Sequence, residues 1–255
     1  MKFSINRESL IKPLNLVAGV VERRQTLPIL SNILIALEGS SLSLTGTDLE
    51  VELVGRLELE TVGVDGEITV PARKLVEICK ALPEGSNIEF KVDTGKATVT
   101  AGRSRFTLST LPAADFPSVD SVTGAHTFRL SQRLMKKLID STSFAMAQQD
   151  VRYYLNGLYL EVVAGRLRVV ATDGHRLALA TAPEKVEVLD AGIIIPRKGV
   201  LELCRLLEGE ETLELTVGSN HIRASNRQFN FTSKLVDGKF PDYERVIPKS
   251  TDKTF

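Results

Sequence analysis

The residues of this chain that could do chemistry are few and widely spaced. Asp173 and His175 have the best spacing for acid–base work, but no G-x-S-x-G nucleophile motif accompanies them. The sequence has no Walker A phosphate loop, no H-E-x-x-H motif and no Cys/His cluster with metal spacing, and its three histidines lie at positions 126, 175 and 221. This pattern favours a protein that has no catalytic activity, no cofactor and no bound metal.

A Thr-Asp pair occurs at positions 47–48 and again at 172–173. Aspartate and threonine side chains often bond to their own backbone two residues on, so we expect two equivalent turns here rather than catalytic groups. The two cysteines, Cys79 and Cys204, each fall on the apolar face of a predicted helix. We interpret both as reduced core residues, because a disulfide between them would require two separate cores to touch.

These residues belong to an internal repeat of about 125 residues. The stretch VPARKLVEICKALPEG begins at Val70, and IPRKGVLELCRLLEGE begins at Ile195. Four more pairs of segments occur in the same order in both halves, at nearly the same offset. They are ESLIKPL with QRLMKKL, NILIALEG with NGLYLEVVAG, SLSLTGTD with LRVVATD, and RFTLSTLPAADFP with NFTSKLVDGKFP. A repeat of this size indicates a duplicated domain rather than a solenoid, whose units are far shorter.

The polar segment PSVDSVTGAH at 117–126 has the composition of a linker. We therefore expect domain one at 1–122 and domain two at 123–250. Each half is predicted to contain an opening strand, a helix, alternating strands, a second helix and further strands. The expected fold class is α+β, with two helices packed on antiparallel sheet in each duplicated domain.

Composition also restricts where the protein acts. The 255 residues are 43% hydrophobic and 25% charged, as in globular proteins. The N-terminus has no apolar core of signal-peptide length, and no stretch approaches the roughly 18 apolar residues that a spanning helix requires. We expect a cytoplasmic protein that does not enter a membrane.

Charge is distributed unevenly although the formal total is zero. The predicted helical segments 7–24, 72–82, 131–141 and 196–207 each carry a net charge of +2, so the rest of the chain carries −8. If the helices share one side of the molecule, that side is a basic stripe suited to a polyanion. Ordinary solvated helix faces that carry lysine are the alternative explanation.

The chain resembles the bacterial DNA polymerase III beta subunits, the replicative sliding clamps. The resemblance is carried by GRSRFTLSTLPAADFP, QQDVRYYLNG, ATDGHRLA, IPRKG and FTSKLVDGKFPDYERV, which are spread over the whole chain. It implies a DNA clamp fold, in which homodimers with three domains per subunit close a ring around duplex DNA. Helices line the hole, and sheets form the outer wall. A third domain is expected after residue 250 and is absent from this chain, which makes the chain a fragment in this interpretation.

The implied function is that of a non-catalytic processivity factor. An enclosing ring needs only weak, sequence-independent contacts with phosphates, so it slides while it tethers the polymerase. The implied partners are double-stranded DNA, the DNA polymerase III alpha subunit, the clamp loader delta subunit, and other polymerases and repair proteins that carry clamp-binding peptides. A protein-interaction scaffold without DNA encirclement is the alternative, and the basic helical faces argue against it.

The resemblance also implies three sets of site residues. The DNA-binding set is Arg24, Arg73, Gln149, Tyr153 and Tyr154. The pocket for partner peptides is Leu155, Thr172, Gly174, His175, Arg176, Leu177, Pro241, Arg245 and Val246. The dimer interface is Lys74, Ile78, Leu82, Arg103, Arg105 and Leu108.

Overall fold

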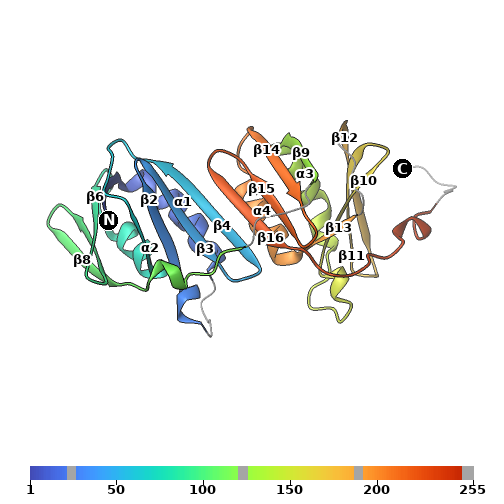
Figure 1. Cartoon of the computed structure of the whole chain (residues 1–255). Coiled ribbons are helices and arrows are strands. Elements are labelled where there is room, and N and C mark those ends of the chain that lie inside the picture. Colours follow the sequence, from blue (N-terminus) through green and yellow to red (C-terminus); the bar gives the residue numbers. More distant parts are fainter. Residues whose placement is uncertain (22–26, 120–125, 187–191, 249–255) are drawn as a thin grey trace.

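The computed structural model describes residues 1–21, 27–119, 126–186 and 192–248. Its elements form two runs with the same order (Figure 1). The first run is β1 Lys2–Asn6, α1 Arg7–Val20, β2 Asn32–Glu38, β3 Ser41–Thr47, β4 Val51–Glu58, β5 Gly66–Pro71, α2 Ala72–Ala81, β6 Asn87–Asp93, β7 Lys96–Ala101 and β8 Ser104–Ser109. The second run is β9 His126–Ser131, α3 Gln132–Thr142, β10 Gly157–Val163, β11 Arg166–Thr172, β12 Leu177–Lys185, β13 Ile193–Pro196, α4 Arg197–Leu206, β14 Thr212–Val217, β15 His221–Ser225 and β16 Phe229–Lys234.

The helices begin where the sequence supplies a cap or a proline. The Asn6 side chain accepts a hydrogen bond from the backbone N–H of Glu8 at the start of α1, and Ser131 does the same for Leu134 in α3. Helices α2 and α4 instead follow directly after Pro71 and Pro196. Each helix buries an apolar stripe at helical spacing, which confirms the predicted helical segments within the described residues.

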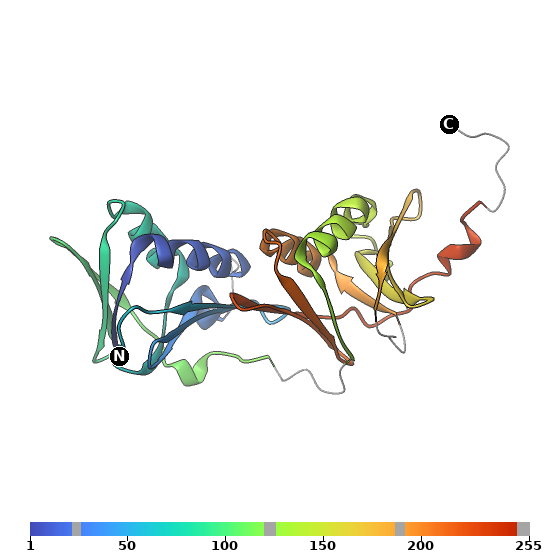
Figure 2. The ribbon, with the colours of Figure 1, turned by 90° about the horizontal axis from the view of Figure 1, so that it is seen from above.

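The strands form three antiparallel sheets. Two four-stranded sheets have the orders β1-β6-β7-β8 and β12-β11-β10-β13. The third sheet has eight strands in the order β5-β2-β3-β4-β16-β15-β14-β9, and half of them come from each run. The two halves are therefore joined by the β4–β16 pair, in which Val51 lies opposite Ser233 and Gly55 opposite Phe229. Figure 2 shows the four helices on one side of this long sheet. The predicted α+β class is confirmed.

One apolar core extends through both halves, and a second, smaller cluster lies under the segment after β16. Both cysteines are free. Cys79 is fully buried as predicted, and burial raises the pKa of its thiol to about 11. Cys204 is only partly buried; its Sγ donates to Asp140, and its carbonyl accepts from the Lys136 ammonium at 3.2 Å. The predicted core position is confirmed for Cys79, whereas Cys204 packs against the core from its boundary.

Among the described residues, no helix is long and apolar enough to cross a membrane. Within the same ranges, no three His, Cys, Asp or Glu side chains gather closely enough to hold a metal ion.

Candidate functional site

The two Thr-Asp pairs form the same turn in both halves. In the turn after β11, Thr172 Oγ1 accepts from the N–H of Gly174, and Asp173 Oδ1 accepts from the N–H groups of His175 and Arg176, both at 3.0 Å. In the turn after β3, at positions 47–51, the threonine and aspartate accept the corresponding backbone hydrogen bonds. The predicted turn is confirmed. Its third residue is left-handed in both halves: Gly174 has a φ of +88°, and its counterpart Leu49 has a φ of +78°, which is unfavourable for a residue with a Cβ.

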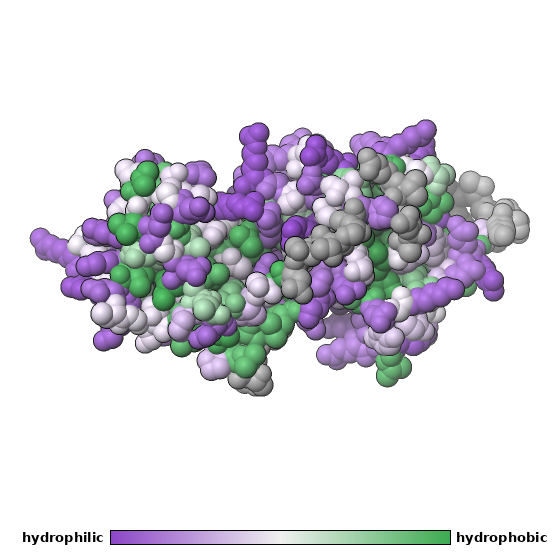
Figure 3. Space-filling model, viewed as in Figure 1, coloured by the Kyte–Doolittle hydropathy of each residue, from purple (hydrophilic) through white to green (hydrophobic). Residues whose placement is uncertain are grey.

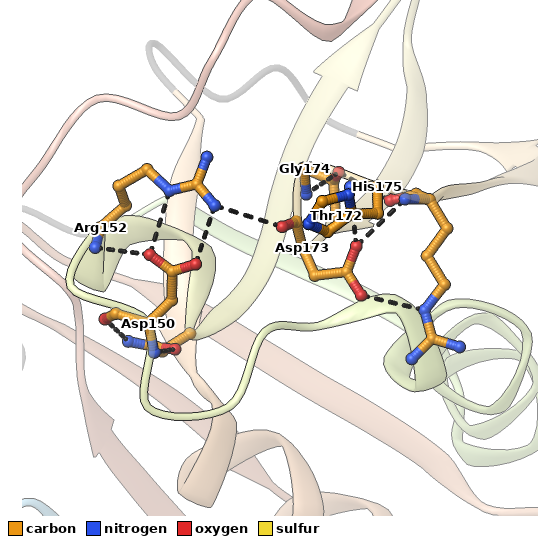
Figure 4. A network of polar contacts seen from close by, with 8 residues as sticks. Asp150, Arg152, Thr172, Asp173, Gly174 and His175 are labelled. Carbon is orange, nitrogen blue, oxygen red and sulfur yellow. Dashed lines mark hydrogen bonds and ion pairs between the residues drawn. The ribbon is translucent and has the colours of Figure 1, made fainter.

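A second carboxylate orders the neighbouring loop. Asp150 accepts from the backbone N–H of Arg152 and from both sides of its guanidinium at 2.8–3.0 Å. Arg152 Nη2 also donates to the carbonyl of Asp173 at 3.3 Å. Figure 4 shows this network joining the loop that precedes β10 to the turn that precedes β12. A group of nine predicted DNA and pocket residues lies on these two segments and the strand ends beside them.

Both aspartates titrate at unusually low pH. The pKa of Asp150 falls to about 2, chiefly through the Arg152 hydrogen bonds, and that of Asp173 falls to about 2, chiefly through backbone N–H groups. A lowered pKa means that the carboxylates support the two segments above their ordinary pKa near 4, and that this support is lost as the pH falls through about 2.

We expect carbon NMR titration to show both midpoints well below 3.8. Arg152→Met should raise the Asp150 midpoint and leave Asp173 nearly unchanged, and equal movement of both would contradict the assignment.

The predicted pocket residues lie on three segments. Leu155 and Leu177 are called the floor, and Pro241, Arg245 and Val246 are called the wall. Leu155 is buried in the small apolar cluster, and the half-buried Leu177 and Tyr154 pack against that cluster. Thr172, Gly174, His175 and Arg176 form the turn beside them, and the Arg176 guanidinium lies 5.6 Å from the centre of the Phe144 ring. Pro241, Arg245 and Val246 are exposed on the segment after β16, where Arg245 pairs with Asp242.

The predicted DNA-binding residues are mostly exposed, and one of them, Arg24, lies outside the described residues. Arg73 projects from α2 and pairs with Glu77 one turn further on. Gln149 is exposed with a φ of +58°, Tyr153 is 58% exposed, and Tyr154 is half-buried. Figure 3 shows apolar atoms at two tips on the lower edge, where Figure 1 places the short helix before β2 and the loop before β10. The exposed Leu27 and Val151 belong to these equivalent segments.

The helix side of the molecule has a reduced but still basic surface. Lys198 turns toward Asp48 of the other half, Arg197 donates to the carbonyl of Met146, and the Lys136 ammonium bonds to a carbonyl of α4. Those three cations are therefore engaged within the chain. Seven other helix cations are exposed: Lys12, Arg73, Lys74, Lys80, Arg133, Lys137 and Arg205. Five of these seven, all except Lys80 and Lys137, also pair with glutamates of this chain.

The predicted dimer residues divide by exposure. Three are exposed: Lys74 on α2, Arg103 in the turn before β8, and Arg105 on β8. Three others are buried within this chain: Ile78, Leu82 and Leu108. Strand β8 is one of the two edges of its four-stranded sheet, whose other edge is β1, and β12 is one edge of the other sheet, opposite β13.

Sequence reasoning did not single out several residues that build the site. Arg152 connects the loop to the turn, and Phe240 and Tyr243 are buried aromatic anchors in the segment that carries the pocket wall. The available signal is two aromatic residues three positions apart, six and nine residues after the end of β16.

The chain matches two family models, described as the N-terminal domain of the DNA polymerase III beta subunit over residues 1–120 and its central domain over residues 129–242. It is 62% identical to the beta sliding clamp of Pseudomonas putida, covering 99% of this chain and 70% of that protein. It is 52% identical to the clamp of Escherichia coli K12, covering 99% and 69%. The crystal structure of a Pseudomonas aeruginosa sliding clamp bound to griselimycin superimposes with a TM-score of 0.96 at 61% identity, over 99% of this chain and 69% of that one.

Proposed function

Because the chain belongs to the DNA polymerase III beta subunits, the bacterial sliding clamps, we propose that its described surfaces divide into a DNA-facing side, a partner pocket and a subunit edge. Its function is that of a processivity factor in bacterial DNA replication. We further propose that it has no catalytic activity, that it acts in the cytoplasm, and that its two domains are divided at 1–122 and 123–250.

The helix side is the proposed DNA-facing side. The four helices lie on this side of the long sheet and carry seven exposed cations (Figure 2). Five of these cations form surface ion pairs with glutamates, which are weak, so they support a diffuse interaction with phosphates rather than base recognition. Arg73 belongs to this surface. The loop with Gln149, Tyr153 and Tyr154 is proposed to meet DNA at the edge, where exposed aromatic rings can stack on bases.

The floor and wall around Leu155 and Leu177 are the proposed pocket for partner peptides. An apolar floor beside a turn with exposed polar groups suits a short peptide that has an apolar anchor and a few hydrogen-bonding groups. The named Pseudomonas aeruginosa clamp binds griselimycin, and the same class of site is proposed here. The DNA polymerase III alpha subunit, the clamp loader delta subunit and repair proteins are the proposed peptide donors.

The internal repeat supports β8 as the subunit edge. By position in the repeat, β16 is the counterpart of β8, and β12 is the counterpart of β4. Strands β16 and β4 pair edge to edge inside the chain. The free edges of their counterparts, β8 and β12, can therefore pair with further domains in the same way. The exposed Arg103, Arg105 and Lys74 would then lie at the contact, with the buried apolar residues beneath them holding the edge in place.

A peptide-binding experiment tests the pocket. We expect a fluorescent peptide that carries a glutamine and a Leu-Phe anchor to bind this chain saturably, and Leu177→Ala to weaken the affinity about tenfold, since removing a contacted leucine side chain costs roughly 1.5 kcal/mol. Fluorescence polarisation measures both. Leu201→Ala, which truncates an exposed leucine on α4, is the matched control and should leave the affinity unchanged.

Two results would contradict the proposed pocket. One is equal weakening by Leu177→Ala and Leu201→Ala. The other is the absence of binding both by this chain and by a version extended to the length of its relatives. Binding by the extended version alone would place part of the pocket in the added region.

A further inference from the structure

The segment after β16 carries the proposed pocket wall but belongs to no sheet. It follows β16 at Lys234 and makes a short helix at Tyr243–Arg245. Figure 1 shows it at the far end of the molecule from β8, beside β10 and β11. Pro241, Arg245 and Val246 are all exposed on it, so their position depends on other residues of the segment.

Tyr243 holds this segment against the sheet through its hydroxyl. The hydroxyl donates to Oε1 of Glu161 on β10 and accepts from Nη1 of Arg168 on β11 at 2.7 Å. The same Arg168 nitrogen donates to Glu244 at 2.9 Å. Hydrogen bonds that involve a charged partner are about twice as strong as neutral ones, so two neighbouring strands fix one tyrosine.

Aromatic packing places the same residue in the cluster under the pocket. Tyr243 is 6% exposed, and Phe240 stacks on Tyr159 of β10 with ring centres 4.7 Å apart and planes at 3°. Leu155 of the pocket floor belongs to this cluster, and Leu177 packs against it. Floor and wall therefore share one small apolar cluster that is separate from the main core.

We propose that Tyr243 is a positioning residue for partner binding, which keeps the pocket wall docked on β10 and β11 through Glu161 and Arg168. The inference rests on the proposed pocket. It adds that the contacts of Tyr243 with Glu161 and Arg168, called the latch below, can break while the sheets stay folded, because these contacts lie outside the main core.

The test removes the hydroxyl and keeps the ring. Tyr243→Phe should weaken binding of the fluorescent peptide at least fivefold and speed tryptic cleavage after Lys239 or Arg245 by a similar factor, with little change in the thermal midpoint of the chain. Glu161→Ala should reproduce this behaviour. Glu161→Gln should restore it to near the wild-type level, since an amide oxygen still accepts from the tyrosine hydroxyl. Glu214→Gln, which alters a remote surface partner of Arg129, is the matched control.

The outcomes separate the latch from the pocket. Faster cleavage with unchanged peptide affinity would overturn the positioning role and leave the pocket in place. Unchanged cleavage and affinity in Tyr243→Phe would overturn the latch. Weakening by Leu177→Ala without any effect of Tyr243→Phe would show that the floor binds peptide independently of the wall, and a chain that binds no peptide at all would remove both proposals.

Discussion

Replacing Gly46 with alanine is expected to lower the free energy of unfolding by about 1–3 kcal/mol, as is typical of overpacking in a filled core. Gly46 lies in β3 directly under α1. A Cβ at this position would stand 2.7 Å from the carbonyl oxygen of Val17 and 2.9 Å from its Cγ1. Because the first of these is a backbone atom of α1, at a residue that is itself buried, no side-chain rotation relieves the contact, and the helix must shift. Urea unfolding followed by circular dichroism measures the change.

The repeat supplies the matched control. Ala171 occupies the corresponding position in β11 and is fully buried. Ala171→Gly should cost only about 1 kcal/mol, from the lost methyl group and the added backbone freedom. The reason for the expected loss at Gly46 is the close approach of α1, not the strand itself. A Gly46→Ala variant as stable as the wild type would show that α1 moves away from the sheet without cost.

The order of elements could be predicted from the sequence because each depends on local signals. Apolar periodicity and the two Thr-Asp turns act over a few residues, and their duplication provided an independent check. The family resemblance added the clamp fold, which the solved structures bear out.

Contacts between the halves could not be predicted in the same way, because equivalent positions in a repeat face different neighbours. Arg73 and Lys198 occupy the same position in α2 and α4. The structure leaves the Arg73 side chain 77% exposed, whereas Lys198 is 30% exposed and turned toward Asp48. The free edge of β8 and the paired edge of β16 differ for the same reason. A repeat predicts the domain, and only the assembled chain shows which of its surfaces are covered.

The contact between Lys198 and Asp48 leads to the second prediction. The Asp48 side chain is 3% exposed, its Oδ1 accepts from the N–H groups of Glu50 and Val51, and its Oδ2 pairs with Lys198. Lys198→Met keeps the aliphatic stem but leaves a buried carboxylate without its cation. We expect the free energy of unfolding to fall by about 2–3 kcal/mol, somewhat less than for a fully buried pair because the lysine is partly exposed. Urea unfolding again gives the value.

A second substitution distinguishes the buried charge from lost packing. Asp48→Asn keeps an oxygen that accepts the two backbone N–H groups but carries no charge. If the cost of Lys198→Met comes from the uncompensated carboxylate, the double variant should be more stable than Lys198→Met alone, with a coupling free energy of about 1–2 kcal/mol. Additive losses would mean that the lysine contributes only packing. In that case the β4–β16 ladder and the continuous core, rather than this ion pair, would hold the two halves in their relative orientation.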